Sequence, residues 1–300
     1  MEGNSDTTAE MFEPSQSETR EGQWTFSAVP RKLSSEEERR LAADTQCIPE
    51  FKRNKLEVEA RKNWDLFYKR NSTNFFKDRH WTTREFEELI AAANSSVSLG
   101  RQGNPKLTSL LEVGCGVGNT VYPLKSANPG LFIHCCDFSP RAVQFVKEHP
   151  DYDATRVNAF QCDITSEELT NHVKPEVVDL VTMFFVLSAI HPDKMVQSLK
   201  NIYKVLGPDG LVLFRDYGLY DHAMLRFSKG HKISDHFYVR QDGTRAYYFT
   251  TEYLRDIFHQ AGFDEVVNEY VYRETVNKKE GLSVPRVFVQ SKFCKRIEKS

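Results

Sequence analysis

Apolar runs and amphipathic segments alternate along most of the chain. Five apolar runs have the length and composition of buried strands: Leu107–Val113, Leu131–Cys136, Phe160–Cys162, Val177–Phe185 and Leu211–Phe214. Helical patterns lie between them, including Pro192–Val205 and a segment that Ser139 and Pro140 begin as cap and first residue. Repeated strand–helix units predict a parallel sheet with right-handed crossovers.

The pattern changes towards the C-terminus. Aromatic runs flank Asp242-Gly243, which predicts a β-hairpin inserted between about residues 219 and 250. A helix over Glu252–Gln260 precedes two strands, around Val266–Val271 and Arg286–Ser291, that flank a turn at 278–281. We therefore expect residues 94–300 to form an α/β domain, with a seven-stranded, mostly parallel sheet and an antiparallel closing hairpin.

Two further segments precede this domain. Residues 1–33 are polar and poor in aliphatic side chains, so we expect a disordered acidic tail. Residues 34–93 form a helical extension, which a polar loop at 94–106 separates from the domain. The extension interleaves basic residues with aromatic ones: Lys52, Arg53, Lys55, Arg61, Lys62, Lys69, Arg70, Lys77, Arg79 and Arg84 with Phe51, Trp64, Phe67, Tyr68, Phe75, Phe76, Trp81 and Phe86.

Trp64 and Tyr68 lie four residues apart and share one face of the expected helix. That face could pack on the domain as an ordinary amphipathic helix. It could also cover a ligand pocket while the basic face contacts RNA phosphates, because cations meet the backbone and aromatic rings stack on exposed bases. Both interpretations stay open, since a helix has two faces.

Composition narrows the classes of function. The net charge of −2 excludes a strong global attraction for nucleic acid, so any basic surface must be local. None of the six cysteines forms a C-x-x-C pair, and the nine histidines show no ligand spacing, so we expect no metal. No apolar stretch reaches the roughly 18 residues of a membrane helix. We expect a protein of the cytoplasm, or also of the nucleus, without membrane association.

Three glycines follow the first predicted strand, at positions 114, 116 and 118. Glycine lets the backbone turn tightly and lets a ligand lie against bare peptide. The G-x-G-x-G spacing differs from the dinucleotide fingerprint, and the turn lacks the lysine and hydroxyl residue of a P-loop. A tight strand–helix turn without a ligand is the alternative.

Acidic residues end the next two strands. Asp137 lies about twenty residues beyond the glycine turn, where a carboxylate can accept both ribose hydroxyls, although it could instead cap a helix. Asp163 and Ile164 suit adenine, the carboxylate at the exocyclic amine and the aliphatic chain against the ring. Ligands of such sheets bind at the carboxyl ends of strands. Ribose and adenine without phosphates indicate S-adenosyl-L-methionine, with S-adenosyl-L-homocysteine as the product.

The glycine turn, V-G-C-G-V-G-N, with its acidic second strand end resembles class I (Rossmann-like) S-adenosylmethionine-dependent methyltransferases. From about residue 35 to 295 the chain more narrowly resembles the tRNA N3-methylcytidine methyltransferases. The matching stretches are residues 63–68 (NWDLFY), 74–81 (NFFKDRHW), 136–139 (CDFS), 185–189 (FVLSA), 191–195 (HPDKM) and 214–218 (FRDYG). Residues 220–227 and 268–281 resemble the subgroup that acts on serine tRNAs.

The resemblance implies an enzyme that methylates cytidine 32 of the anticodon loop, with seryl-tRNA synthetase as a helper. It also implies cofactor contacts at positions that match the family: Trp64, Tyr68, Gly114, Asp137, Asp163, Ile164 and Phe184. We add Gly116 from the same turn. A methyltransferase of this fold for proteins or small molecules, and a non-catalytic adaptor for tRNA or synthetase, are the alternatives. We expect a monomer.

Cytosine N3 carries a lone pair and no proton, so the reaction requires no strong base. The product is a cation, and a carboxylate near its exocyclic amine would orient the base and favour the positive charge. Asp216, at the end of the fifth strand, is the catalytic candidate, and Arg215 could contact a phosphate or the cytosine O2. An internal salt bridge between the two is the alternative. N3 lies on the pairing edge, so the nucleotide must be unpaired or flipped.

Candidate substrate residues come from the extension and from the insertion. Aromatic candidates for stacking on the base are Phe75, Phe76, His80 and Trp81; the two phenylalanines could instead form a hydrophobic cap. Cationic candidates for the tRNA backbone are Arg79, Arg226, Arg240 and Arg245; solvated charges without a partner are the alternative.

Overall fold

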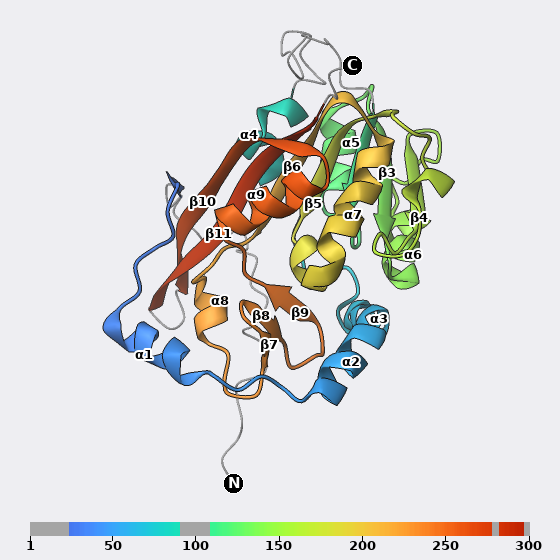
Figure 1. The fold of residues 1–300 in the computed structure, drawn as a ribbon. Coiled ribbons are helices and arrows are strands. Elements are labelled where there is room, and N and C mark those ends of the chain that lie inside the picture. Colours follow the sequence, from blue (N-terminus) through green and yellow to red (C-terminus); the bar gives the residue numbers. More distant parts are fainter. Residues whose placement is uncertain (1–23, 91–108, 278–281, 297–300) are drawn as a thin grey trace.

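The computed structural model describes residues 24–90, 109–277 and 282–296. In this part of the chain an eight-stranded sheet has the order β1-β10-β11-β6-β5-β2-β3-β4 (Figure 1). Its strands are β1 (Thr25–Ser27), β2 (Ser109–Val113), β3 (Phe132–Asp137), β4 (Val157–Gln161), β5 (Val178–Phe184), β6 (Leu206–Tyr217), β10 (Phe263–Asn277) and β11 (Leu282–Lys295).

The half of the sheet from β6 to β4 is parallel, which confirms the predicted architecture. Helices α5 (Val121–Ala127), α6 (Pro140–Glu148) and α7 (Pro192–Val205) pack on this half, with short 3-10 turns η2 (Leu169–Asn171) and η3 (Leu187–Ala189). Helix α9 (Thr251–Gln260) packs against β10 and α7. Leu110 packs into one apolar cluster and Leu111 into another. Successive side chains of a strand point to opposite faces, so β2 is buried on both. This central position fixes the glycine turn that follows it.

The other half of the sheet is antiparallel, with β11 between β6 and β10. The sequence predicted seven strands, and the described sheet has an eighth, β1, whose Thr25 pairs with Tyr272. Part of the expected disordered tail is therefore ordered from Trp24 onward. The ring of Trp24 lies 4.2 Å from the Arg215 guanidinium carbon, a cation–π contact that helps to offset the entropy of ordering this segment. Residues 1–23 lie outside the described part.

The insertion forms a second, small sheet of β7 (Lys232–Ser234), β8 (Phe237–Val239) and β9 (Arg245–Tyr247), next to helix α8 (His222–Leu225). Strands β8 and β9 pair around Asp242-Gly243, which confirms the predicted hairpin; β7 was not predicted. Gly243 has φ +83°, the left-handed conformation that this turn requires.

Within the N-terminal extension, helices α2 and α3 lie beneath the carboxyl ends of the parallel strands, α1 lies beside α8, and α4 lies near the other end of the sheet (Figure 1). It comprises α1 (Ser35–Ala43), α2 (Glu50–Val58), α3 (Ala60–Asn71), α4 (Trp81–Glu85) and the 3-10 turn η1 (Glu87–Leu89). Ser34 and Glu37 form a capping box on α1, as its sequence favours. Phe67 and Tyr68 of α3 are buried against Val117 and Ala142 of the domain. The predicted boundary loop at 94–106 and the turn at 278–281 lie outside the described residues.

Candidate active site

A cavity of about 330 Å³ separates helices α2 and α3 from the carboxyl ends of the parallel strands. Six predicted cofactor residues line it together: Trp64, Tyr68, Gly114, Asp137, Asp163 and Ile164. The other two, Gly116 and Phe184, line a smaller adjoining cavity. The structure thus brings together residues that lie far apart in the sequence, on two walls of one cleft.

The glycine turn is closely approached from two sides. A Cβ on Gly114 would lie 2.4 Å from Cγ2 of Val186, in the loop after β5, and a Cβ on Gly116 would lie 3.1 Å from the Tyr68 hydroxyl. Both glycines also have positive φ, +64° and +54°. The turn therefore needs glycine for its conformation and for the space beside it.

Asp137 presents a buried carboxylate to the larger cavity. Its Oδ1 accepts a hydrogen bond from the Ser139 amide at 2.9 Å, and its Oδ2 accepts one from the Gly116 amide at 3.0 Å. Burial raises the pKa of Asp137 to about 6, against the lowering effect of those amide donors. Helix α6 is capped by the Ser139 hydroxyl, which accepts from the Ala142 amide, so capping does not account for the whole arrangement. The remaining acceptor capacity fits the two hydroxyl donors of a ribose.

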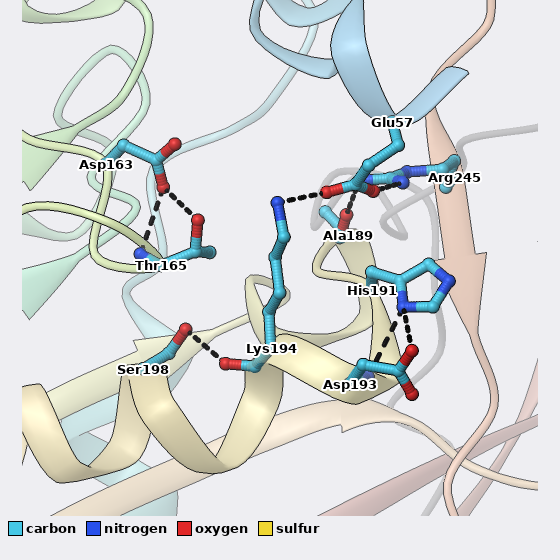
Figure 2. Close-up of polar contacts among 9 residues, drawn as sticks. All are labelled: Glu57, Asp163, Thr165, Ala189, His191, Asp193, Lys194, Ser198 and Arg245. Carbon is cyan, nitrogen blue, oxygen red and sulfur yellow. Dashed lines mark hydrogen bonds and ion pairs between the residues drawn. The ribbon is translucent and has the colours of Figure 1, made fainter. Parts of the chain in front are cut away.

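Asp163 and Ile164 form the neighbouring part of the wall. Asp163 Oδ1 accepts hydrogen bonds from the amide and hydroxyl of Thr165, at 3.0 and 2.7 Å (Figure 2). The Ile164 carbonyl accepts from Asn201 at 3.2 Å, which ties this loop to α7. A fixed carboxylate beside an aliphatic side chain fits the exocyclic amine and ring face of adenine. The two acceptor carboxylates and the apolar side chain therefore fit the ribose and adenine of S-adenosylmethionine.

Helix α3 supplies the opposite wall. The rings of Trp64 and Tyr68 lie 6.1 Å apart, and burial raises the pKa of Tyr68 well above its usual range, so its hydroxyl stays neutral. Asp65 anchors the helix by accepting from the Ser139 hydroxyl at 2.9 Å. The aromatic face thus packs on the domain and also lines the larger cavity, and contact of the basic face with RNA stays a prediction.

The smaller cavity, of about 40 Å³, adjoins the glycine turn. Its lining includes four predicted substrate residues: Phe76, Arg79, Arg240 and Arg245. Arg79 donates to the Thr120 hydroxyl and to the Phe184 carbonyl, both at 3.4 Å. Arg240 donates to the Arg245 carbonyl at 2.9 Å. These three arginines are buried rather than solvated, and each donates hydrogen bonds to groups within the fold.

Asp216 lies directly behind this lining. Its Oδ2 accepts from the Ser188 amide at 3.0 Å and its Oδ1 from the Tyr217 amide at 2.8 Å, and both partners line the smaller cavity. Burial raises the pKa of Asp216 to about 6. Its catalytic role stays a prediction.

Arg215 and Trp81 lie elsewhere than we expected. The Arg215 side chain is 1% exposed and packs between the rings of Trp24 and Trp81, at 4.2 and 4.6 Å from the guanidinium carbon. The Trp81 ring also contacts Phe184 at 5.4 Å. Neither residue lines either cavity, because the aromatic cluster holds both side chains within the fold.

Three further substrate candidates do not line the cavities either. His80 and Arg226 are exposed. Phe75 packs against Phe67, at a ring distance of 5.0 Å, which favours the hydrophobic-cap interpretation for this side chain. In contrast, sequence analysis missed Ser188, Tyr217 and Lys194 as lining residues. Tyr217 follows Asp216 in the F-R-D-Y-G stretch, which is the signal that could have identified it.

Within residues 24–90, 109–277 and 282–296, no helix is long and apolar enough to cross a bilayer. The same residues contain no cluster of three or more His, Cys, Asp or Glu side chains arranged to hold a metal ion.

The fold and this cleft define a class I S-adenosylmethionine-dependent methyltransferase. The sequence model of a protein family described as a methyltransferase domain matches residues 111–212. Solved structures agree on the fold. A chain of the complex between the Haloferax volcanii Trm112 methyltransferase activator and a putative methyltransferase aligns with a TM-score of 0.56 and 15% identity, over 80% of this chain and 99% of that one. An Anabaena variabilis S-adenosylmethionine-dependent methyltransferase gives 0.54 and 14%, over 79% and 95%.

Comparison with curated relatives identifies the family within this class of methyltransferases. The chain is 60% identical over 265 residues to the human tRNA N(3)-cytidine methyltransferase METTL6, covering 88% of this chain and 90% of the relative. It is 62% identical to the Mus musculus METTL6, over 88% and 91%. It is 40% identical to the Danio rerio tRNA N(3)-cytidine methyltransferase METTL2, over 86% and 80%. The chain belongs to the tRNA N(3)-cytidine methyltransferase family.

Proposed function

We propose that this protein transfers a methyl group from S-adenosylmethionine to N3 of cytidine 32 in the anticodon loop of serine tRNAs. One observation carries the proposal beyond family membership: the two cavities share a wall. Trp64, Tyr68, Gly114, Phe185 and Arg245 line both of them. A base at the mouth of the smaller cavity would therefore lie next to a cofactor in the larger one.

When bound, the cofactor supplies an electrophilic sulfonium methyl group. The chain's own residues position the nucleophile and stabilise its developing charge. The buried Asp216 carboxylate, acting through the Ser188 and Tyr217 segment, favours a cationic base in a site of low dielectric. The rings of Phe185 and Tyr217, 5.3 Å apart, offer aromatic faces to a flipped base.

The choice of serine tRNAs, with seryl-tRNA synthetase as a partner, rests on two stretches and on the relatives. Residues 220–227 contain Asp221, whose Oδ2 accepts from Arg286 at 2.9 Å and from the Val287 amide at 2.7 Å, which docks α8 on β11. The chain is also more similar to METTL6, at 60%, than to METTL2, at 40%. We propose that the chain belongs to this subgroup of the family and therefore acts on one class of tRNA.

The test is methylation of purified tRNAs by the full-length protein, with nucleosides identified by mass spectrometry and the position mapped by sequencing. Reactions run with and without seryl-tRNA synthetase. We expect N3-methylcytidine at position 32 of serine tRNAs and more of it with the synthetase. Asp137→Ala, which removes the expected ribose acceptor, is the inactive control. Methylation of another nucleoside, or of a protein or small molecule alone, would overturn the proposal, and tRNA binding without methylation would indicate an adaptor.

A further inference from the structure

Glu57, near the end of α2, joins three separate parts of the fold (Figure 2). Its Oε1 lies 2.5 Å from Nζ of Lys194, in the first turns of α7. Its Oε2 accepts a hydrogen bond from Arg245, the first residue of β9. One carboxylate thus bridges a cation of the methyltransferase domain and a cation of the insertion.

All three residues of this bridge line the larger cavity. Arg245 is held in place, because it also donates to the Ala189 carbonyl at 3.1 Å, and its side chain is 6% exposed. Burial acts to raise the pKa of Glu57, but hydrogen bonds from Lys194 and Arg245 outweigh it and lower that pKa. The bridge therefore stays ionised near neutral pH, with charge-assisted bonds that are stronger than those between neutral groups.

Among the described residues, apolar packing on α2 is limited to Leu56, which is partly buried against the main hydrophobic core. None of the nine residues of this helix, all within the described part of the chain, is buried. Phe51 is 67% exposed and Val58 is 85% exposed. Helix α3, in contrast, is held by buried Phe67 and Tyr68 and by further polar contacts of its own.

The contacts of α3 lie on both sides of the cleft. Asn63 donates to the Gly243 carbonyl at 3.1 Å, on the insertion. Asp65 accepts from the Ser139 hydroxyl at 2.9 Å, on the domain. These contacts hold α3 in place over the cavity, whereas the Glu57 bridge lies on the side that α2 forms.

We propose that Glu57 is a positioning residue that holds α2 closed over the cofactor cavity and so sets how long the cofactor stays bound. Glu57, Val58 and Ala60 form part of that cavity's wall, so α2 covers one side of the cavity while the bridge is intact. Breaking this carboxylate–cation network leaves α2 held by Leu56 and by its junction with α3 at Glu59. The inference concerns cofactor exchange and does not depend on which tRNA is the substrate.

The experiment measures release of S-adenosylhomocysteine from the full-length protein by stopped-flow fluorescence, using the tryptophan at position 64 as reporter. In Glu57→Gln we expect about tenfold faster release and correspondingly weaker affinity, the range of an ordinary coupling free energy. Hydrogen exchange of α2 amides in the cofactor-free protein should accelerate as well, while exchange in α3 stays unchanged. Glu59→Gln is the matched control, because Glu59 pairs with Lys62 at 2.9 Å outside the cavity wall.

A second variant separates loss of the bridge from a general loss of stability in Glu57→Gln. Lys194→Gln removes one arm of the bridge at a side chain that is 46% exposed, and should accelerate release by a smaller factor. The double variant should release the product no faster than Glu57→Gln alone, because the two residues act through one bridge. Wild-type release rates and wild-type α2 exchange in Glu57→Gln, or effects of the two substitutions that multiply fully, would overturn the proposal.

Discussion

Arg215 and Asp216 are consecutive on β6, and their side chains lie on opposite faces of the sheet. Asp216 accepts from the Ser188 amide at 3.0 Å, behind the smaller cavity. Arg215 lies between Trp24 and Trp81, with its guanidinium carbon 4.2 and 4.6 Å from their rings. The alternation of a strand separates them. Asp216 therefore lies at the candidate site, whereas Arg215 helps to attach the N-terminal strand β1.

Arg215→Lys should lower stability without weakening tRNA binding. Lysine keeps the charge but loses the planar group between two rings, so we expect a loss of about 1–2 kcal/mol in the free energy of unfolding. Denaturant titration measures this, and filter binding with serine tRNA measures affinity. A stable variant with weaker tRNA binding would instead place Arg215 against the substrate.

Asp216→Asn should abolish the acidic limb of the turnover profile. Burial raises the pKa of Asp216 to about 6, and the carboxylate is the form that favours a cationic base, so wild-type turnover should fall as the pH drops through about 6. The variant should be slower by about a hundredfold, the scale of one lost electrostatic contact, and flat across this range. Turnover is measured at saturating cofactor and tRNA, and calorimetry should give an unchanged cofactor affinity. A variant with wild-type turnover would remove Asp216 from catalysis.

Gly116→Ala should weaken cofactor binding. The new Cβ would lie 3.1 Å from the Tyr68 hydroxyl and would occupy a backbone conformation with φ +54°, at a cost of about 1–2 kcal/mol. Calorimetry with S-adenosylhomocysteine reports the loss of affinity. Gly130→Ala is the matched control, because a Cβ there meets nothing within 4 Å. Equal affinities in the two variants would show that the turn does not contact the cofactor.

Glu112→Gln should change how stability depends on pH. Burial raises the pKa of Glu112 from 4.5 to about 7, opposed by the charge of Arg79. Between these values the native state keeps a proton that the unfolded state loses, so the contribution of Glu112 to stability falls as the pH rises. The amide side chain of the variant does not titrate, so the variant shows no such decrease. The free energy of unfolding of the variant minus that of the wild type should therefore increase between about pH 4.5 and 7, by at most about 3 kcal/mol. Parallel stability curves for the two proteins would contradict this.

Local patterns in the sequence determined the elements and the cofactor wall. The parallel strands follow from apolar runs, the turn after β2 from its glycines, and the β8–β9 hairpin from Asp242-Gly243. Asp137 and Asp163 could be placed together because parallel strands end at one edge of the sheet. These inferences need periodicity, turn chemistry and topology, which are all encoded over short distances.

Contacts between distant segments were decided by the tertiary structure. Glu57 meets Arg245 across 188 positions, and no local pattern distinguishes this glutamate from its exposed neighbours on the same helix. Arg215 was expected at the substrate, but Trp24, from a segment predicted to be disordered, covers it instead. A side chain's partner depends on which surfaces the folded chain brings together. The sequence thus determined the strands and the acidic residues at their ends, and packing decided which charged side chains line the cleft and which lie within the fold.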